Sequence, residues 1–80
     1  MHFVYILQSI PHPDQLYTGV AGDVQTRLAA HNAGQSPHTA KFKPWRLLSY
    51  HWFERQETAT AFERYLKSGS GRAFARKHLR

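Results

Sequence analysis

The sequence predicts an α+β fold, a small three-stranded antiparallel sheet flanked by helices in the order ββαβαα. Three observations predict it. Two short aromatic and β-branched runs near the N-terminus are separated by a turn cluster, a third such run lies past the middle of the chain, and segments with helical spacing follow the second and third runs. Eighty residues suffice for one domain, which we expect to span residues 1–80.

The first two strands are expected to form a hairpin. Residues 3–7 are an apolar run typical of a buried strand, and residues 16–20 are the second run. Residues 11–14 between them contain two prolines, which regular elements exclude, and the short connection favours antiparallel pairing. Gly19, inside the second strand, indicates a bend or a close approach of another group to the backbone.

The first helix is expected to begin after Asp23, a good N-cap residue. Val24 and Leu28 lie one turn apart and form its apolar stripe. Gly34 stands where a helix C-terminus favours glycine. Residues 35–44 are polar and basic and are predicted to form a loop.

The third strand and the next helix follow. Residues 45–53 are rich in aromatic and aliphatic side chains, which is typical of a strand. Residues 57–67 are predicted to be helical because apolar residues recur on one face at spacings of three and four, namely Ala59, Phe62 and Leu66.

A last short helix is expected near the C-terminus. Gly69 is predicted to end the preceding helix, and Ser70 to cap the new one. Phe74 and Leu79 are its apolar residues.

The charge balance points to a polyanionic partner. The chain carries 11 Lys and Arg against 5 Asp and Glu, a net charge of +6 and a pI near 10.2. Residues 64–80 hold no acid and six bases: Arg64, Lys67, Arg72, Arg76, Lys77 and Arg80. Neutralising phosphates releases condensed counterions, so this clustering favours nucleic acid over the alternatives of a generic basic protein or an anionic membrane surface.

Other features exclude several classes of protein. There is no cysteine, which removes disulfides and cysteine-ligated zinc and suits a reducing compartment. No segment approaches the roughly 20 apolar residues that cross a bilayer, and the N-terminus has no charged region of a secretory signal. We therefore expect a soluble cytoplasmic protein with no membrane association, and no protein partner can be identified.

Two strand motifs, an arginine and a glutamate occur in a fixed order. Residues 3–5 (Phe-Val-Tyr) and 17–19 (Tyr-Thr-Gly) each hold a strand tyrosine, Arg27 lies eight residues beyond Gly19, and Glu63 sits in the later helix. Over nearly the whole chain this pattern resembles the GIY-YIG nucleases, especially the small stand-alone members. The resemblance implies a metal-dependent DNA endonuclease of the kind found in DNA repair, with Arg27 and Glu63 central to its site.

Elementary chemistry agrees with these two roles. The Arg27 guanidinium is a planar, permanent charge that matches phosphate geometry, although a solvated helix arginine is the alternative. The Glu63 carboxylate is a hard ligand for one Mg²⁺ or Mn²⁺ ion, and a single carboxylate suffices because Mg²⁺ keeps several waters. The alternative for Glu63 is a surface ion pair with Lys67, four residues later. Glu63 borders the apolar face, which favours the metal.

Three further residues are candidates for handling the attacking water. A phenol is a poor base at neutral pH unless nearby cations lower its pKa, so Tyr5 or Tyr17 would depend on Arg27 and the metal. Base roles are argued for either tyrosine in the family, and Tyr17 is slightly favoured. His31 lies one turn after Arg27 on the same helix face and is expected to assist, the alternative being an ordinary surface histidine.

DNA is the expected partner, branched or single-stranded rather than read by sequence, because 80 residues offer little base-reading surface. The residues expected to bind it are Lys41, Lys43, Lys67, Arg72, Arg76 and Lys77. The first motif has no glycine and the second has Thr18 in its middle, departures that the stand-alone members tolerate. Two others leave an alternative open: Val20 stands where many members have lysine, and no asparagine follows Glu63. That alternative is a basic module that binds nucleic acid without cleaving it.

Overall fold

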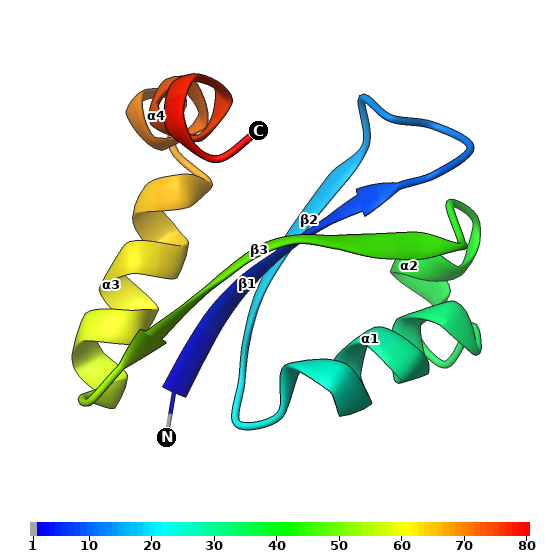
Figure 1. Ribbon diagram of the computed structural model, residues 1–80, viewed down its shortest axis with the longest axis horizontal. Coiled ribbons are helices and arrows are strands. Elements are labelled where there is room, and N and C mark those ends of the chain that lie inside the picture. Colours follow the sequence, from blue (N-terminus) through cyan, green and yellow to red (C-terminus); the bar gives the residue numbers. More distant parts are fainter. Residues whose placement is uncertain (1) are drawn as a thin grey trace.

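The computed structural model describes residues 2–80 and has an open three-stranded antiparallel sheet (Figure 1). The strand order is β2-β1-β3, so that β1 lies in the centre. The strands are β1 (His2–Ser9), β2 (Leu16–Ala21) and β3 (Trp45–Phe53). The predicted α+β fold is confirmed, as is the predicted hairpin of the first two strands.

Helices cover both faces of the sheet (Figure 1). One face carries α1 (Val24–Asn32) and α2 (Pro37–Ala40), and the other carries α3 (Gln56–Leu66) and α4 (Gly69–His78). No helix among residues 2–80 is long and apolar enough to cross a bilayer.

The central strand β1 is buried on both faces, which explains its continuous apolar run. Val4 and Ile6 pack with residues of α3 and α4, whereas Tyr5 and Leu7 pack with α1 and the start of β3. Because successive side chains of a strand point to opposite faces, this alternation assigns Tyr5 to the α1 side of the molecule.

The predicted signals at both ends of α1 are confirmed. The Asp23 carboxylate accepts a hydrogen bond from the backbone N–H of Thr26 at 3.1 Å, which caps the helix. Gly34 follows the helix with φ 77°, a left-handed conformation that glycine adopts without a steric penalty.

The segment 35–44 was predicted to be a loop, and this is wrong for four of its residues, which form α2. Pro37 occupies the first turn, where its missing N–H costs nothing, and Ser36 precedes it. The segment is tied down at both ends. The Asn32 side chain exchanges two hydrogen bonds with the backbone of Trp45, and the Trp45 indole N–H donates to the Thr39 carbonyl at 2.9 Å.

The boundary between α3 and α4 also differs from the prediction. Gly69 does not end α3; it is the first residue of α4, and the cap is Ser68 rather than Ser70. The Ser68 hydroxyl accepts from the Gly71 N–H at 3.1 Å and donates to the Tyr65 carbonyl at 2.6 Å. A Cβ on Gly71 would lie 1.8 Å from that carbonyl oxygen, so the start of α4 approaches the end of α3 too closely for any residue but glycine at this position.

Candidate active site

The site begins with a tyrosine that crosses over a glycine. Tyr5 on β1 pairs with Gly19 on β2, and Tyr5 has no exposed surface. A Cβ on Gly19 would lie 2.6 Å from the Tyr5 hydroxyl oxygen and 2.7 Å from Cζ. The glycine predicted to allow a close approach does so for the ring of Tyr5, which therefore reaches across β2 toward α1.

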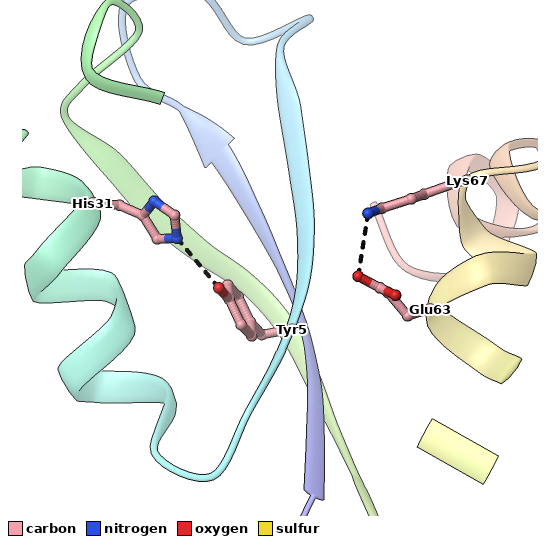
Figure 2. A network of polar contacts seen from close by, with 4 residues as sticks. All are labelled: Tyr5, His31, Glu63 and Lys67. Carbon is pink, nitrogen blue, oxygen red and sulfur yellow. Dashed lines mark hydrogen bonds and ion pairs between the residues drawn. The ribbon is translucent and has the colours of Figure 1, made fainter. Parts of the chain in front are cut away.

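Three of the predicted residues meet at this point. The Tyr5 hydroxyl lies 3.2 Å from Nε2 of His31, within hydrogen-bond distance (Figure 2). The Tyr17 ring lies 4.7 Å from the His31 ring and 6.2 Å from the Tyr5 ring, between centroids. His31 is only 4% exposed, so the alternative of an ordinary surface histidine is excluded.

Arg27 joins the same cluster electrostatically. Its guanidinium is exposed, and its interaction with the Tyr5 hydroxyl raises the pKa of Arg27 further above its already high value. Burial raises the pKa of Tyr5, and this effect is opposed by Arg27. Burial, and then the charge of Arg27, lower the pKa of His31. The cluster therefore holds a permanent cation beside a neutral phenol and a neutral imidazole at physiological pH.

Glu63 lies apart from this cluster, on the α3 side of the sheet (Figure 2). Its carboxylate accepts a hydrogen bond from Nζ of Lys67 at 3.1 Å, so the ion pair considered from the sequence does form. The Glu63 side chain is 24% exposed and that of Lys67 is 55% exposed. Among residues 2–80, no hydrogen bond or ion pair joins Glu63 to the cluster of Tyr5, His31 and Arg27.

The donor set around Glu63 fits one kind of metal ion. No group of three or more His, Cys, Asp or Glu residues gathers within residues 2–80, so no cage for zinc exists in that part of the chain. A magnesium ion commonly binds one or two carboxylates and completes its shell with waters and substrate phosphates. The lone, partly exposed Glu63 carboxylate is compatible with such an ion.

A basic groove of about 570 Å³ is lined by Tyr17 of the cluster and by Lys67, the ion-pair partner of Glu63. The core residues Ile6, Leu66 and Ala75 and Thr18 of β2 also line it. Its charged lining residues are four cationic side chains (Lys67, Arg72, Arg76 and Arg80) and one acidic side chain, Asp14. Tyr17 thus borders both the buried cluster and the groove.

The groove includes only some of the residues expected to bind nucleic acid. Lys41, Lys43 and Lys77 are exposed but do not line it, and Lys41 instead lies over the ring of Phe42 at 5.7 Å. Two further lining residues, His38 and Arg80, were not predicted to belong to the site. Arg80 belonged to the basic C-terminal run already noted, whereas nothing in the spacing of His38 indicates its position.

Thr39 was also missed. Its hydroxyl lies 2.8 Å from Nδ1 of His31, and the residue is 1% exposed. A sequence signal existed for the burial of His31, which follows Val24 by seven residues and so shares the apolar stripe of α1. No comparable signal existed for Thr39, which lies in the segment predicted to be a loop.

A sheet between two helical layers, an arginine beside two tyrosines, and an adjoining basic groove define an α+β domain with a site suited to phosphate-rich ligands. The chain belongs to the GIY-YIG family: the family model described as the GIY-YIG catalytic domain matches residues 1–77. The resemblance seen in the sequence is thereby confirmed.

Relatives in two distant organisms agree with this assignment. A UPF0213 protein of Streptococcus pyogenes serotype M3 is 33% identical over 72 residues, which cover 89% of this chain and 76% of the relative. A UPF0213 protein of Haloquadratum walsbyi is 34% identical over 68 residues, covering 84% and 74%. The GIY-YIG family is a nuclease superfamily, which points to endonuclease activity with DNA as substrate, and its nucleases generally depend on divalent metal ions.

Proposed function

We propose that this chain is a divalent-metal-dependent endonuclease that hydrolyses DNA phosphodiester bonds and selects DNA by strand or branch structure rather than by sequence. The observation that carries the proposal is the cluster of Arg27, Tyr5, Tyr17 and His31, in which Tyr17 also lines a basic groove. A purely structural arginine would have no reason to lie beside two tyrosines and a neutral histidine.

Arg27 holds the scissile phosphate in this proposal. Its exposed guanidinium is free to engage phosphoryl oxygens, and the interaction with the buried Tyr5 restricts where it points. A preorganised charge of this kind stabilises the additional negative charge that develops on the phosphate in the transition state.

Tyr17 is the better candidate to orient the attacking water. Tyr5 has no exposed surface, and its raised pKa opposes loss of its proton. Tyr17 is only half-buried and lines the groove, so a water molecule near the phosphate can contact its hydroxyl. The buried residues Tyr5 and His31 then hold Arg27 and Tyr17 in position without contacting the substrate.

Glu63 would hold one Mg²⁺ or Mn²⁺ ion, for which its lone carboxylate is a suitable ligand. When bound, such an ion supplies Lewis-acid stabilisation of charge on the phosphate oxygens. The ammonium of Lys67 donates to the Glu63 carboxylate, and Lys67 also lines the groove. Once Glu63 binds a metal ion, this ammonium can contact a DNA phosphate instead.

The dimensions of the groove support selection by strand structure. A volume of about 570 Å³ is typical of a site for a small ligand. Only part of a duplex, whose major groove alone is about 12 Å wide, would contact a groove of this size. One unpaired strand with a few phosphates matches both the volume of the groove and the charge of Arg72 and Arg76 in its lining.

A nicking assay tests the proposal on supercoiled plasmid, a single-stranded oligonucleotide and a branched junction, with Mg²⁺, Mn²⁺ or a chelator. Cleavage should require metal and should disappear in Glu63→Gln, which keeps the shape of the side chain. Glu57→Gln is the matched control, because Glu57 lies on the same helix in a similar exposed ion pair with Arg55. This control should cleave normally.

Two results would contradict the proposal. Glu63→Gln with wild-type activity in Mg²⁺ would remove Glu63 from the mechanism. Wild-type protein that binds each DNA but cleaves none with either metal would favour the non-catalytic basic module.

A further inference from the structure

Three buried polar side chains form a chain of contacts behind the active-site surface. The Tyr5 hydroxyl lies 3.2 Å from Nε2 of His31, Nδ1 of His31 lies 2.8 Å from the Thr39 hydroxyl, and that hydroxyl lies 3.5 Å from the Ser36 carbonyl oxygen. Tyr5, His31 and Thr39 are 0%, 4% and 1% exposed. Water does not reach these groups freely, so each proton in the chain needs an acceptor within it.

The direction of the hydrogen bonds depends on which ring nitrogen of His31 carries the proton. If His31 carries its proton on Nδ1, that N–H donates to Thr39, the Thr39 hydroxyl donates to the Ser36 carbonyl, and Nε2 accepts the Tyr5 proton. If His31 carries it on Nε2, the Tyr5 oxygen accepts that proton. The Tyr5 hydrogen must then turn to Tyr17, because its remaining neighbour, the Arg27 guanidinium, is only a donor. The Thr39 hydroxyl must also give its hydrogen to Nδ1 instead of to the Ser36 carbonyl.

We propose that Thr39 is a positioning residue: its hydroxyl fixes His31 as the Nδ1–H tautomer, so that the Tyr5 proton points to His31 and the Tyr5 oxygen is presented to Arg27. The inference rests on the proposed role of Arg27. In the opposite tautomer the Tyr5 oxygen accepts the His31 proton, and the Tyr5 hydrogen turns to Tyr17. His31 then competes with Arg27 for the Tyr5 oxygen, which weakens the contact that restricts the direction of Arg27.

The position of Thr39 is itself firmly held. Its carbonyl accepts the hydrogen bond from the Trp45 indole at 2.9 Å, and Trp45 is 4% exposed. Trp45 is in turn bonded through its backbone to the side chain of Asn32 at the end of α1. The helix that carries His31 and the helix that carries Thr39 are thus joined to the same residue of β3, which keeps the 2.8 Å contact in register.

The surroundings of His31 agree with a neutral ring. The titratable and charged groups that face it are Arg27 on its own helix, Tyr5 on β1 and Tyr17 on β2. None of these is a carboxylate, and burial together with the Arg27 charge lowers the pKa of His31. With no carboxylate to fix the ring, the hydroxyl of Thr39 takes the place that an acid occupies beside many active-site histidines.

The first test is the tautomer of His31 in the metal-free, DNA-free protein, measured from the ¹⁵N signals of its ring. We expect a pyrrole-type Nδ1 and a pyridine-type Nε2 in the wild type. In Thr39→Val, which keeps the shape but not the acceptor, the two assignments should exchange. Thr39→Ser should retain the wild-type assignment, and Thr60→Val on α3, across the sheet, controls for the loss of a threonine hydroxyl elsewhere.

The second test is the single-turnover rate at saturating DNA and metal. In serine proteases, fixing the histidine in the wrong tautomer lowers kcat by about 10⁴, because there the histidine itself transfers the proton. His31 acts through Tyr5 and Arg27, so we expect a smaller loss in Thr39→Val, of about tenfold or more. Thr39→Ser should recover most of the rate, and Thr60→Val should keep it.

Several outcomes would overturn the inference. They are a wild-type His31 protonated on Nε2, a tautomer that does not change in Thr39→Val, and a Thr39→Ser protein as impaired as Thr39→Val. Failure of the proposed function is seen separately, as full activity in Arg27→Ala. The ¹⁵N assignment is made without substrate and does not depend on that activity.

Discussion

Replacing Gly19 with alanine tests whether the close crossing of Tyr5 over β2 builds the active site. The added Cβ would lie 2.6 Å from the Tyr5 hydroxyl oxygen and 2.7 Å from Cζ, distances at which atoms overlap. Tyr5 is fully buried, so its ring cannot swing into solvent. Something in the core must shift, and the 3.2 Å contact with His31 is the first to be lost.

Two contributions lower the stability of Gly19→Ala and one raises it. Overpacking a core by one methyl group costs about 1–3 kcal/mol. Losing the buried hydrogen bond to His31 costs about 1 kcal/mol more. Removing a glycine stabilises the folded state by about 0.4–1 kcal/mol, because the unfolded chain loses entropy. The net destabilisation is about 1–3 kcal/mol, which lowers the Tm of an 80-residue domain by roughly 5–20 °C.

Urea and thermal unfolding measure this change, and Gly69→Ala is the matched control. A Cβ on Gly69 has no heavy atom within 4 Å, so this variant should be as stable as the wild type or up to about 1 kcal/mol more stable. Nicking should be assayed well below both melting temperatures, where Gly19→Ala remains folded yet cuts slowly. If Gly19→Ala matches Gly69→Ala in both stability and rate, the crossing of Tyr5 is not what organises the site.

Three further predictions concern charge. The free energy of unfolding of Arg27→Ala should lie within about 0.5 kcal/mol of the wild-type value, since Arg27 is exposed. This variant should cleave about 10²–10³ times more slowly, and Arg27→Lys should recover little of the rate. Unimpaired cleavage by Arg27→Ala would exclude Arg27 from the chemistry. Binding titrations should give a slope of log affinity against log salt concentration of about −4 to −5, which corresponds to about five phosphate contacts at about 0.9 each. The double variant Arg72→Ala/Arg76→Ala should have a shallower salt slope than Lys77→Ala, because Lys77 lies outside the groove. Equal slopes would refute the role of the groove. Because the pKa of His31 is lowered in the folded state, the unfolded state binds the proton more readily, and stability should fall as pH drops below about 6.5. In urea melts, the stability of His31→Gln should depend less steeply on pH. A pH dependence equal to that of the wild type would contradict this role of His31.

Much of the fold was predictable because local chemistry and tertiary packing agree. The run 45–53 forms a strand with the predicted bounds, and Asp23 caps α1 as expected. The errors lie where packing between elements decides. Gly71 lies too close to the Tyr65 carbonyl for any side chain, and α4 begins at Gly69 with Ser68 as its cap, although Ser70 is an equally good cap by composition.

The active site was predictable only in part, for a related reason. Tyr5, Tyr17 and His31 could be named from their positions in the chain, but their division of labour depends on burial. Tyr5 is completely enclosed with a raised pKa, whereas Tyr17 is half-buried and borders the groove. Two tyrosines in equivalent strand positions therefore differ in access to water, and this difference favours Tyr17 as the residue that meets the substrate.

Thr39 illustrates what sequence spacing could not supply. A threonine in a polar segment has no preferred partner in the sequence, and its contact with His31 depends on the Trp45 indole holding α2 against α1. The polar groups at this point are satisfied by one another, and no buried side-chain nitrogen or oxygen within residues 2–80 is left without a partner. Because the direction of each hydrogen bond in a buried chain sets the direction of the next, the residue at its far end influences how the residue at its exposed end is presented. Substitutions in α2, which does not itself bind the phosphate in this proposal, should therefore change the position of Arg27 through His31 and Tyr5.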